Sequence, residues 1–428
     1  MSLHEVFFSL LVLLLPTQLG RHFWPKWSYV YGLRIDYLAP TVYLTDLVIL
    51  GILISWGVEK LKIKNVPQSG IPLRRKKIKI TKKNSKNLIL LVLIFTFLFF
   101  NCLTAQNHGA AFYKFFKIIE FTFLGFYISK EIPQLLITNY QLLSVTVIYS
   151  SLIAITQFFK QSSLGGIFWW LGERTFNLTT PGIAKGIWRE KVFLRPYGTF
   201  SHPNSLAGFI LICLILILGN ESLKKTGLLA IFLGLVVLVT SFSRSVWIVG
   251  LSVGFIYFLF RFWKKLFTYR SFYLFIFSIF YLLFFIFYLN STLFDESVFR
   301  RLELNLVAIK LIKQSSFFGV GLNNFIPAMV GLEQNFGWTY WLQPVHNIYL
   351  LIAAETGLIG LVIFLWLIFL LCKRLLITNY QLLITALIAI LFLGFFDHYW
   401  LTLQQNQILM TIIFGLCCNK KIFFHRSI

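Results

Sequence analysis

Long apolar runs follow one another along almost the whole chain, and they limit the folds open to it more than any other feature. Examples are "LLVLIFTFLFF" and "IYLLIAAETGLIGLVIFLWLIFLLC". A helix that crosses the hydrocarbon core of a bilayer needs roughly 20 consecutive apolar residues. Hydrophobic residues make up 58% of the 428 residues and charged residues only 13%, which is outside the range of soluble globular domains. The sequence therefore predicts an all-α polytopic membrane protein.

Charged and turn-forming clusters divide the apolar runs into about twelve predicted spans. We place these spans near 5–19, 40–57, 87–103, 110–129, 135–157, 204–220, 226–242, 245–262, 271–290, 347–372, 375–395 and 399–418. No soluble domain is appended, so residues 1–428 are expected to form a single integral membrane domain. The long loops that remain are 58–86, 158–203 and 291–346.

The loop 58–86 fixes the predicted orientation, because it carries eleven lysines and arginines and one acidic residue. Basic loops stay on the cytoplasmic side, where anionic lipids attract them. This loop also supplies much of the net charge of +24, and no folded basic domain suggests nucleic-acid binding. The loops 158–203 and 291–346 then face outward.

Four arginines lie on the predicted outer side near spans: Arg195, Arg244, Arg300 and Arg301. The positive-inside rule gives no reason for them. Arg195 could simply anchor the chain at the membrane interface. One of the two arginines Arg300 and Arg301 could anchor an amphipathic surface helix that follows them. One side of that helix would carry Leu302, Leu306, Ile309 and Lys313. The alternative is that the arginines bind phosphate, whose oxygens match the guanidinium fork.

Other polar side chains begin spans on the same side. In "RPYGTFSHPNSLAGF", residues 195–209, His202 is expected in a turn or as a helix cap, and Asn204 begins an outward helix N-terminus that suits an anion. His346 and Asn347 precede another span. His346 alone fits a capping role as well as it fits a general base.

Two charged positions fall inside predicted spans and therefore need partners. Glu355 lies nine residues after His346. Lys114, Lys117 and Glu120 share one helical face, and they either pair structurally or line the same cavity.

No D-x-D, H-E-x-x-H, nucleophile elbow or dinucleotide fingerprint occurs, so we predict no metal and no cofactor. Arginines around one outward pocket suggest a lipid-linked diphosphate whose charge grows as its sugar leaves. His346 would accept the proton of the attacking hydroxyl. Together these residues predict glycosyl transfer. A transporter of an anionic substrate and a noncatalytic scaffold are the alternatives.

The sequence resembles the O-antigen ligase and polymerase family of bacterial membranes over residues 190–375. The motifs that carry the resemblance, in the family's order, are "RPYGTFSHPNSLAGF", "SFSRS", "RRLELNLVAIKLI", "GVGLNNF" and "HNIYLLIAAETGLIG". His346 and Gly357 match the spacing of the ligases' His-to-Gly pattern. Arg300 and Leu304 match their Arg-to-Leu pattern.

The resemblance implies a metal-independent, GT-C-like glycosyltransferase with twelve spans and a surface helical subdomain in the loop 291–346. Its donor would be a glycan on undecaprenyl diphosphate, used on the outer face of the cytoplasmic (inner) membrane. The acceptor would be a lipid A–core sugar, another glycan repeat unit or a protein.

Overall fold

The computed structural model describes eight stretches of the chain: residues 1–65, 82–131, 140–188, 191–219, 223–263, 296–332, 342–378 and 381–419. The predicted span 271–290 and most of the basic loop 58–86 lie outside these stretches. The described chain is mainly helical, as the apolar runs predict.

The long helices are α1 (Leu3–Leu13), α2 (Leu44–Asn65), α3 (Lys82–Leu103), α4 (His108–Glu131), α6 (Tyr140–Lys160), α7 (Pro203–Leu218), α8 (Lys225–Thr240), α9 (Arg244–Trp263), α11 (Glu296–Gln314), α13 (Ile348–Thr378), α14 (Gln381–Leu393) and α16 (Gln404–Cys417). Shorter helical turns are η1 (Lys26–Ser28), η2 (Gly166–Leu171), α12 (Phe325–Val330) and α15 (Tyr399–Thr402).

Three small antiparallel pairs of strands join the helices. Their strands are β1 (Gly20–His22) with β4 (Thr41–Tyr43), β2 (Tyr29–Val30) with β3 (Leu33–Arg34), and β5 (Lys185–Trp188) with β6 (Lys191–Leu194). The first pair aligns Arg21 with Val42.

Each predicted span within the described stretches overlaps one of the long helices, although several boundaries differ. The first helix ends at Leu13 rather than near 19, shortly before Pro16, because proline cannot donate its backbone nitrogen to a continuing helix. By length and composition, two described helices are able to cross a membrane: Tyr140–Lys160 and the part of α13 over Ile348–Leu376. Whether the other predicted spans cross a bilayer stays a prediction.

The centre of the helical bundle is α7, which is apolar on all sides and buried along nearly its whole length. A helix of that kind has no face suited to water. It packs against α6, α8, α9, α14 and α16. Its N-terminal end, which carries His202 and Asn204, is thereby fixed in the middle of the molecule.

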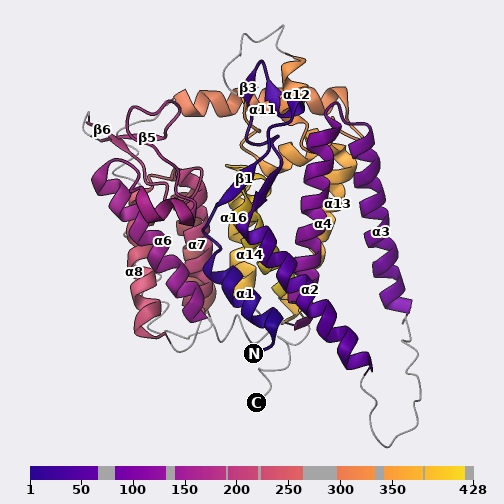
Figure 1. Cartoon of the computed structure of the whole chain (residues 1–428), viewed down its shortest axis with the longest axis horizontal. Helices are drawn as coiled ribbons and strands as arrows, with labels where there is room; N and C mark the ends of the chain where they lie inside the picture. The colour runs from indigo at the N-terminus through magenta and orange to yellow at the C-terminus, as the bar shows by residue number, and fades with distance from the viewer. Residues whose placement is uncertain are drawn as a thin grey trace, which may run out of the picture.

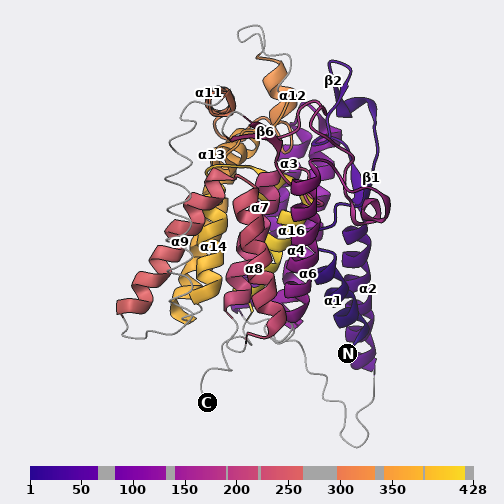
Figure 2. The same ribbon diagram turned by 90° about the vertical axis from the view of Figure 1, so that its left-hand side faces the viewer.

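The two ends of the bundle differ. The strand pairs, α11 and α12 gather at one end, whereas the N-terminus, the end of α2 and the start of α3 lie at the other (Figure 1). The helix α11 runs across the long helices in Figure 1 and is seen end-on in Figure 2. Its residues Leu304, Ala308 and Leu311 are buried, while Leu302 and Leu306 are more than half exposed. The outer loops of the prediction thus meet at one end of the fold.

The kink in α13 is made at Gly357, where φ is +70°. A Cβ atom there would collide with the backbone of Phe317. Gly319 and Gly321 also have positive φ, and the backbone N–H groups of Val320 and Gly321 donate to Ala354 and Glu355 at 2.9 Å. These glycines therefore let the loop after α11 turn tightly against α13.

Candidate functional site

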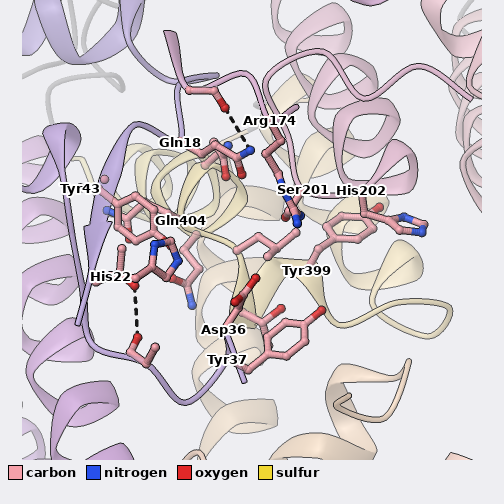
Figure 3. Close-up of a pocket in the computed structure, with 18 of the residues that line it drawn as sticks. Gln18, His22, Asp36, Tyr37, Tyr43, Arg174, Ser201, His202, Tyr399 and Gln404 are labelled. Atoms are coloured by element: carbon pink, nitrogen blue, oxygen red, sulfur yellow. Dashed lines mark hydrogen bonds between the residues drawn. The ribbon is translucent and has the colours of Figure 1, made fainter. Parts of the chain in front are cut away.

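A pocket of about 530 Å³ opens among the elements at the end of the fold that carries the strand pairs. This volume is in the range of small-ligand sites. Residues that line it come from the segment 18–43, from α4, from the segment 169–175, and from the chain around His202, His346 and His398. In Figure 3, His202 and Tyr399 lie at one side of the pocket, and His22 and Tyr43 lie at the other.

Two histidines and one carboxylate meet in the pocket. Side-chain nitrogen and oxygen atoms of His346, Asp397 and His398 lie within 4.8 Å of one another. The rings of the two histidines are 5.0 Å apart between their centroids. These residues come from two connections that are far apart in the sequence, and the fold brings the connections together.

The packing of α13 against α14 positions the cluster. Asn347 caps α13, since its Oδ1 accepts from the backbone N–H groups of Tyr349 at 2.9 Å and Leu350 at 3.0 Å. Its Nδ2 donates to the Phe395 carbonyl at 3.3 Å. Asn347 thus joins the start of α13 to the chain just before Asp397.

Asp397 is held by hydrogen bonds on both oxygens. Oδ1 accepts from the backbone N–H of His398 at 2.9 Å, and Oδ2 accepts from Nδ2 of Asn204 at 3.1 Å. Asn204 in turn accepts from Arg195 at 2.6 Å. Arg195 also donates through Nε to the Ser241 carbonyl at 2.7 Å. Arg195 therefore reaches the cluster through Asn204.

His202 is the N-cap of α7, and its Nδ1 accepts from the backbone N–H of Asn204 at 3.1 Å. The cap role that the sequence predicts is confirmed. His202 also lines the pocket. Burial, with Arg195 nearby, lowers the pKa of His202 to about 3, so its imidazole is neutral and able to accept this bond.

The charge state of the cluster follows from burial and from its neighbours. Burial lowers the pKa of His346 to about 3, although the charge of Asp397 opposes this shift. Burial alone would raise the pKa of Asp397, but His346, His398 and Arg301 together lower it below its usual range. At neutral pH the cluster thus holds one carboxylate and neutral imidazoles, and His346 Nδ1 is buried without a hydrogen-bond partner in the described part of the chain.

The four predicted arginines occupy different places. Arg301, on α11, is close enough for its charge to lower the pKa of His202, His346 and Asp397. Arg300 is its neighbour, and Arg244 is the first residue of α9. None of these four arginines lines the pocket. Arg174, an exposed residue that follows η2, lines it instead.

The charged residues inside α4 and α13 have partners. Lys117 lines the pocket and forms ion pairs with Asp46 at 2.5 Å and Glu120 at 3.2 Å. Glu355 is buried near the ammonium of Lys114 and accepts from the backbone N–H of Phe325 at 3.4 Å. Both alternatives of the sequence analysis hold for Lys117, which pairs structurally and lines the cavity.

Sequence reasoning missed several pocket residues. Asp397 and His398 stand next to each other just before a predicted span, and that adjacency was the signal available. The run "QQNQ" at residues 404–407 lies inside that span and begins α16 with four consecutive amide side chains, all of them buried. Arg174 carried no local signal, because its loop is far from the recognised motifs.

The cluster of His346, Asp397 and His398 is also placed so that a single cation could contact all three. We predicted no metal because the sequence contains no metal-binding motif. A local motif could not reveal this cluster, because its residues come from separate loops. Nδ1 of His398 is already 2.7 Å from the hydroxyl of Thr402, which leaves its other nitrogen for a ligand.

Comparison with known proteins gives one family. Residues 229–365, about a third of the chain, match the family model described as O-antigen ligase. No curated protein matches the chain. The match confirms the resemblance noted in the sequence, and it includes α11, His346 and the kink at Gly357. It supports a glycan-transferring membrane enzyme of surface polysaccharide biosynthesis.

Proposed function

We propose, from the premise that residues 229–365 carry an O-antigen ligase domain, that this protein transfers a glycan from undecaprenyl diphosphate to an acceptor hydroxyl. The observation that carries the proposal is the position of His346. A neutral imidazole lines a pocket next to the carboxylate of Asp397 and within the field of Arg301. That arrangement suits proton abstraction beside a place where negative charge develops.

In the proposed reaction, His346 takes the proton of the acceptor hydroxyl as its oxygen attacks the anomeric carbon of the donor sugar. The bond from that carbon to the diphosphate oxygen breaks, and the diphosphate leaves with the electron pair. Asp397 stabilises the imidazolium that forms, because the two groups lie close together. The pKa of His346 rises toward neutral once the donor's negative charge is bound nearby.

The arginines have separate roles in this scheme. Arg301 and Arg174 would neutralise the departing diphosphate. The charge of Arg301 acts on the cluster, and Arg174 lines the pocket. Arg195 is a positioning residue that acts through Asn204. Binding of the diphosphate by Arg244 and Arg300 stays a prediction.

We place the pocket on the outer face of the inner membrane, in a GT-C-like bundle of about twelve spans. The end of α2 and the start of α3, which flank the basic loop, lie at the opposite end of the bundle from α11 and α12 (Figure 1). A membrane-impermeant thiol reagent applied to intact cells should label Thr179→Cys, which is exposed beyond the pocket, and not Lys62→Cys. Labelling of Lys62→Cys alone would place the pocket in the cytoplasm.

The transfer itself is tested with purified protein, the host's lipid-diphosphate-linked glycan and three acceptors: lipid A–core, a second lipid-linked repeat unit and an acceptor protein. Transfer to one of these, lost in His346→Ala and sharply reduced in Arg301→Ala, supports the proposal. Absence of transfer to all three, with flux of an anionic solute into proteoliposomes that neither substitution changes, would favour the transporter.

A further inference from the structure

We infer that the pocket wall formed by Trp169 and four glutamines is a subsite for neutral sugar rings, which stack on the tryptophan and donate hydroxyl hydrogens to the glutamine oxygens. This inference rests on the proposed function and deepens it, because it names pocket residues that would bind the glycan itself. Two of these glutamines, Gln18 and Gln404, are labelled in Figure 3.

Five glutamines line the pocket, and most of them turn their amide nitrogen toward the protein. Four of them donate through Nε2. Gln18 donates to the Gly172 carbonyl at 3.1 Å, and Gln405 donates to the Thr199 carbonyl at 3.3 Å. Gln404 donates to the Thr45 hydroxyl at 3.1 Å and to the Asp46 carboxylate, and Gln407 donates to the Leu401 carbonyl. Carbonyl and carboxylate oxygens only accept hydrogen bonds. The orientation of these amides is therefore fixed by their partners.

The Oε1 atoms of these four glutamines accept no hydrogen bond from any residue that the structure describes. They are held as acceptors for a molecule that brings hydrogen-bond donors. A diphosphate is an acceptor itself and would be repelled by these oxygens. Sugar hydroxyl groups donate, and an amide oxygen with two lone pairs can accept from two of them.

Trp169 supplies an apolar surface beside these acceptors. It lies on η2, lines the pocket and is 53% exposed. Its neighbours Ile167 and Trp170 are more exposed still, at 76% and 67%, but neither lines the pocket. Anchoring at a membrane interface explains exposed Ile167 and Trp170. It does not explain a tryptophan at the wall of a polar pocket.

The backbone around η2 is held firmly, so Trp169 has a fixed position. The buried carboxylate of Glu173 accepts from the backbone N–H groups of Leu164 at 2.6 Å and Gly165 at 2.7 Å, just before η2. At the last residue of η2, the Leu171 carbonyl accepts from the hydroxyl of Thr17 at 2.6 Å. A preorganised aromatic side chain loses little entropy on binding.

The first test measures binding without turnover. The probe is the neutral oligosaccharide released by mild acid from the host's lipid-linked glycan, titrated against the full-length protein by isothermal calorimetry. Trp169→Ala should weaken binding about five- to tenfold, and Gln18→Met should weaken it as well. Ile167→Ala is the matched control and should leave the affinity unchanged, because this exposed side chain lies on the same short helix and does not line the pocket.

The second test identifies which glycan uses the subsite. In the transfer assay, Trp169→Ala should raise the KM of the acceptor alone if acceptor sugars bind there, or the KM of the donor alone if donor sugars do. The kcat should change little in either case, and the affinity for inorganic pyrophosphate should be unchanged.

Two results would overturn the inference. One is oligosaccharide affinity that is unaffected by Trp169→Ala. The other is equal weakening by Trp169→Ala and Ile167→Ala, which assigns η2 a structural or membrane role. If oligosaccharide binding depends on Trp169 but the protein has no transferase activity, the proposed function is contradicted and the sugar subsite is still supported.

Discussion

Arg195 and Asp397 hydrogen-bond the same amide, the side chain of Asn204. Asn204 accepts from Arg195 at 2.6 Å and donates to Asp397 at 3.1 Å. The arginine thereby orients the amide, and the amide orients the carboxylate beside His346. This relation links the motif "RPYGTFSHPN" to a residue almost two hundred positions later.

Breaking this link should impair transfer without removing any residue that touches substrate. We expect Asn204→Leu to lower kcat about 10- to 100-fold, as for other residues that orient a functional group from behind. Asn204→Asp keeps an acceptor for Arg195 but adds a charge beside Asp397, which raises the pKa of that carboxyl. The acid limb of the pH–rate profile should then move to higher pH, whereas a purely structural defect would lower the rate equally at every pH.

His346→Gln should lower kcat about 10²- to 10⁴-fold, the usual contribution of a general base. Glutamine keeps the polarity of the position and cannot take up the proton. Binding of the lipid-linked donor, measured by protection against thermal unfolding, should persist. Wild-type rates in this variant would contradict the assignment of His346 as the base.

Treatment with EDTA should leave transfer unchanged if His346 and Asp397 act as a base and its stabilising carboxylate. The experiment is informative because their polar atoms and those of His398 approach within 4.8 Å. Loss of activity that zinc or manganese restores would instead assign these three residues to a metal ion.

His202 should make the protein less stable in mild acid. Its pKa is lowered to about 3 in the folded protein, mainly by burial, and is about 6.5 in the unfolded chain. Below pH 6.5 the unfolded chain binds a proton that the folded protein does not, so stability falls as the pH falls. Between pH 7.5 and 5 this contributes up to about 2 kcal/mol.

His202→Asn is the matched variant for this prediction, because asparagine is a good helix N-cap and does not titrate. Its thermal unfolding midpoint should decline less between pH 7.5 and 5 than that of the wild type. Parallel pH curves for the two proteins would contradict the prediction.

Gly357→Ala should destabilise the protein by about 2–3 kcal/mol or more, because φ is +70° there and the new methyl group meets the backbone of Phe317. Gly57→Ala is the control: this glycine lies within α2 with nothing near its added Cβ, so the substitution should be neutral or slightly stabilising. Thermal unfolding of both variants in detergent measures the difference, and an equal effect would contradict the role of the kink.

Much of the fold could be predicted from local sequence. Apolar runs define the helices because hydrophobic patterning acts over a few turns, and the paired arginines before "LELNLVAIKLI" indicated the helix that became α11. His346 and Asn347 were found because they begin an apolar run next to other outward polar residues. The resemblance to O-antigen ligases also rested on such short motifs, and the family match agrees with it.

The pocket itself was decided by tertiary structure. In the sequence, Asp397 and Gln18 look like ordinary loop residues. They become pocket residues only because α13, α14 and the segment 18–43 pack around the end of α7. The same packing put Arg174 at the pocket wall and left Arg195 behind it.

The sequence by itself thus determined which segments are helical and which end of the bundle gathers the unusual polar residues, since charge and hydropathy report on local partition between water and lipid. Only the tertiary structure decided which polar groups face one another, because hydrogen bonds and electrostatic fields act over a few ångströms and depend on contacts between distant parts of the chain.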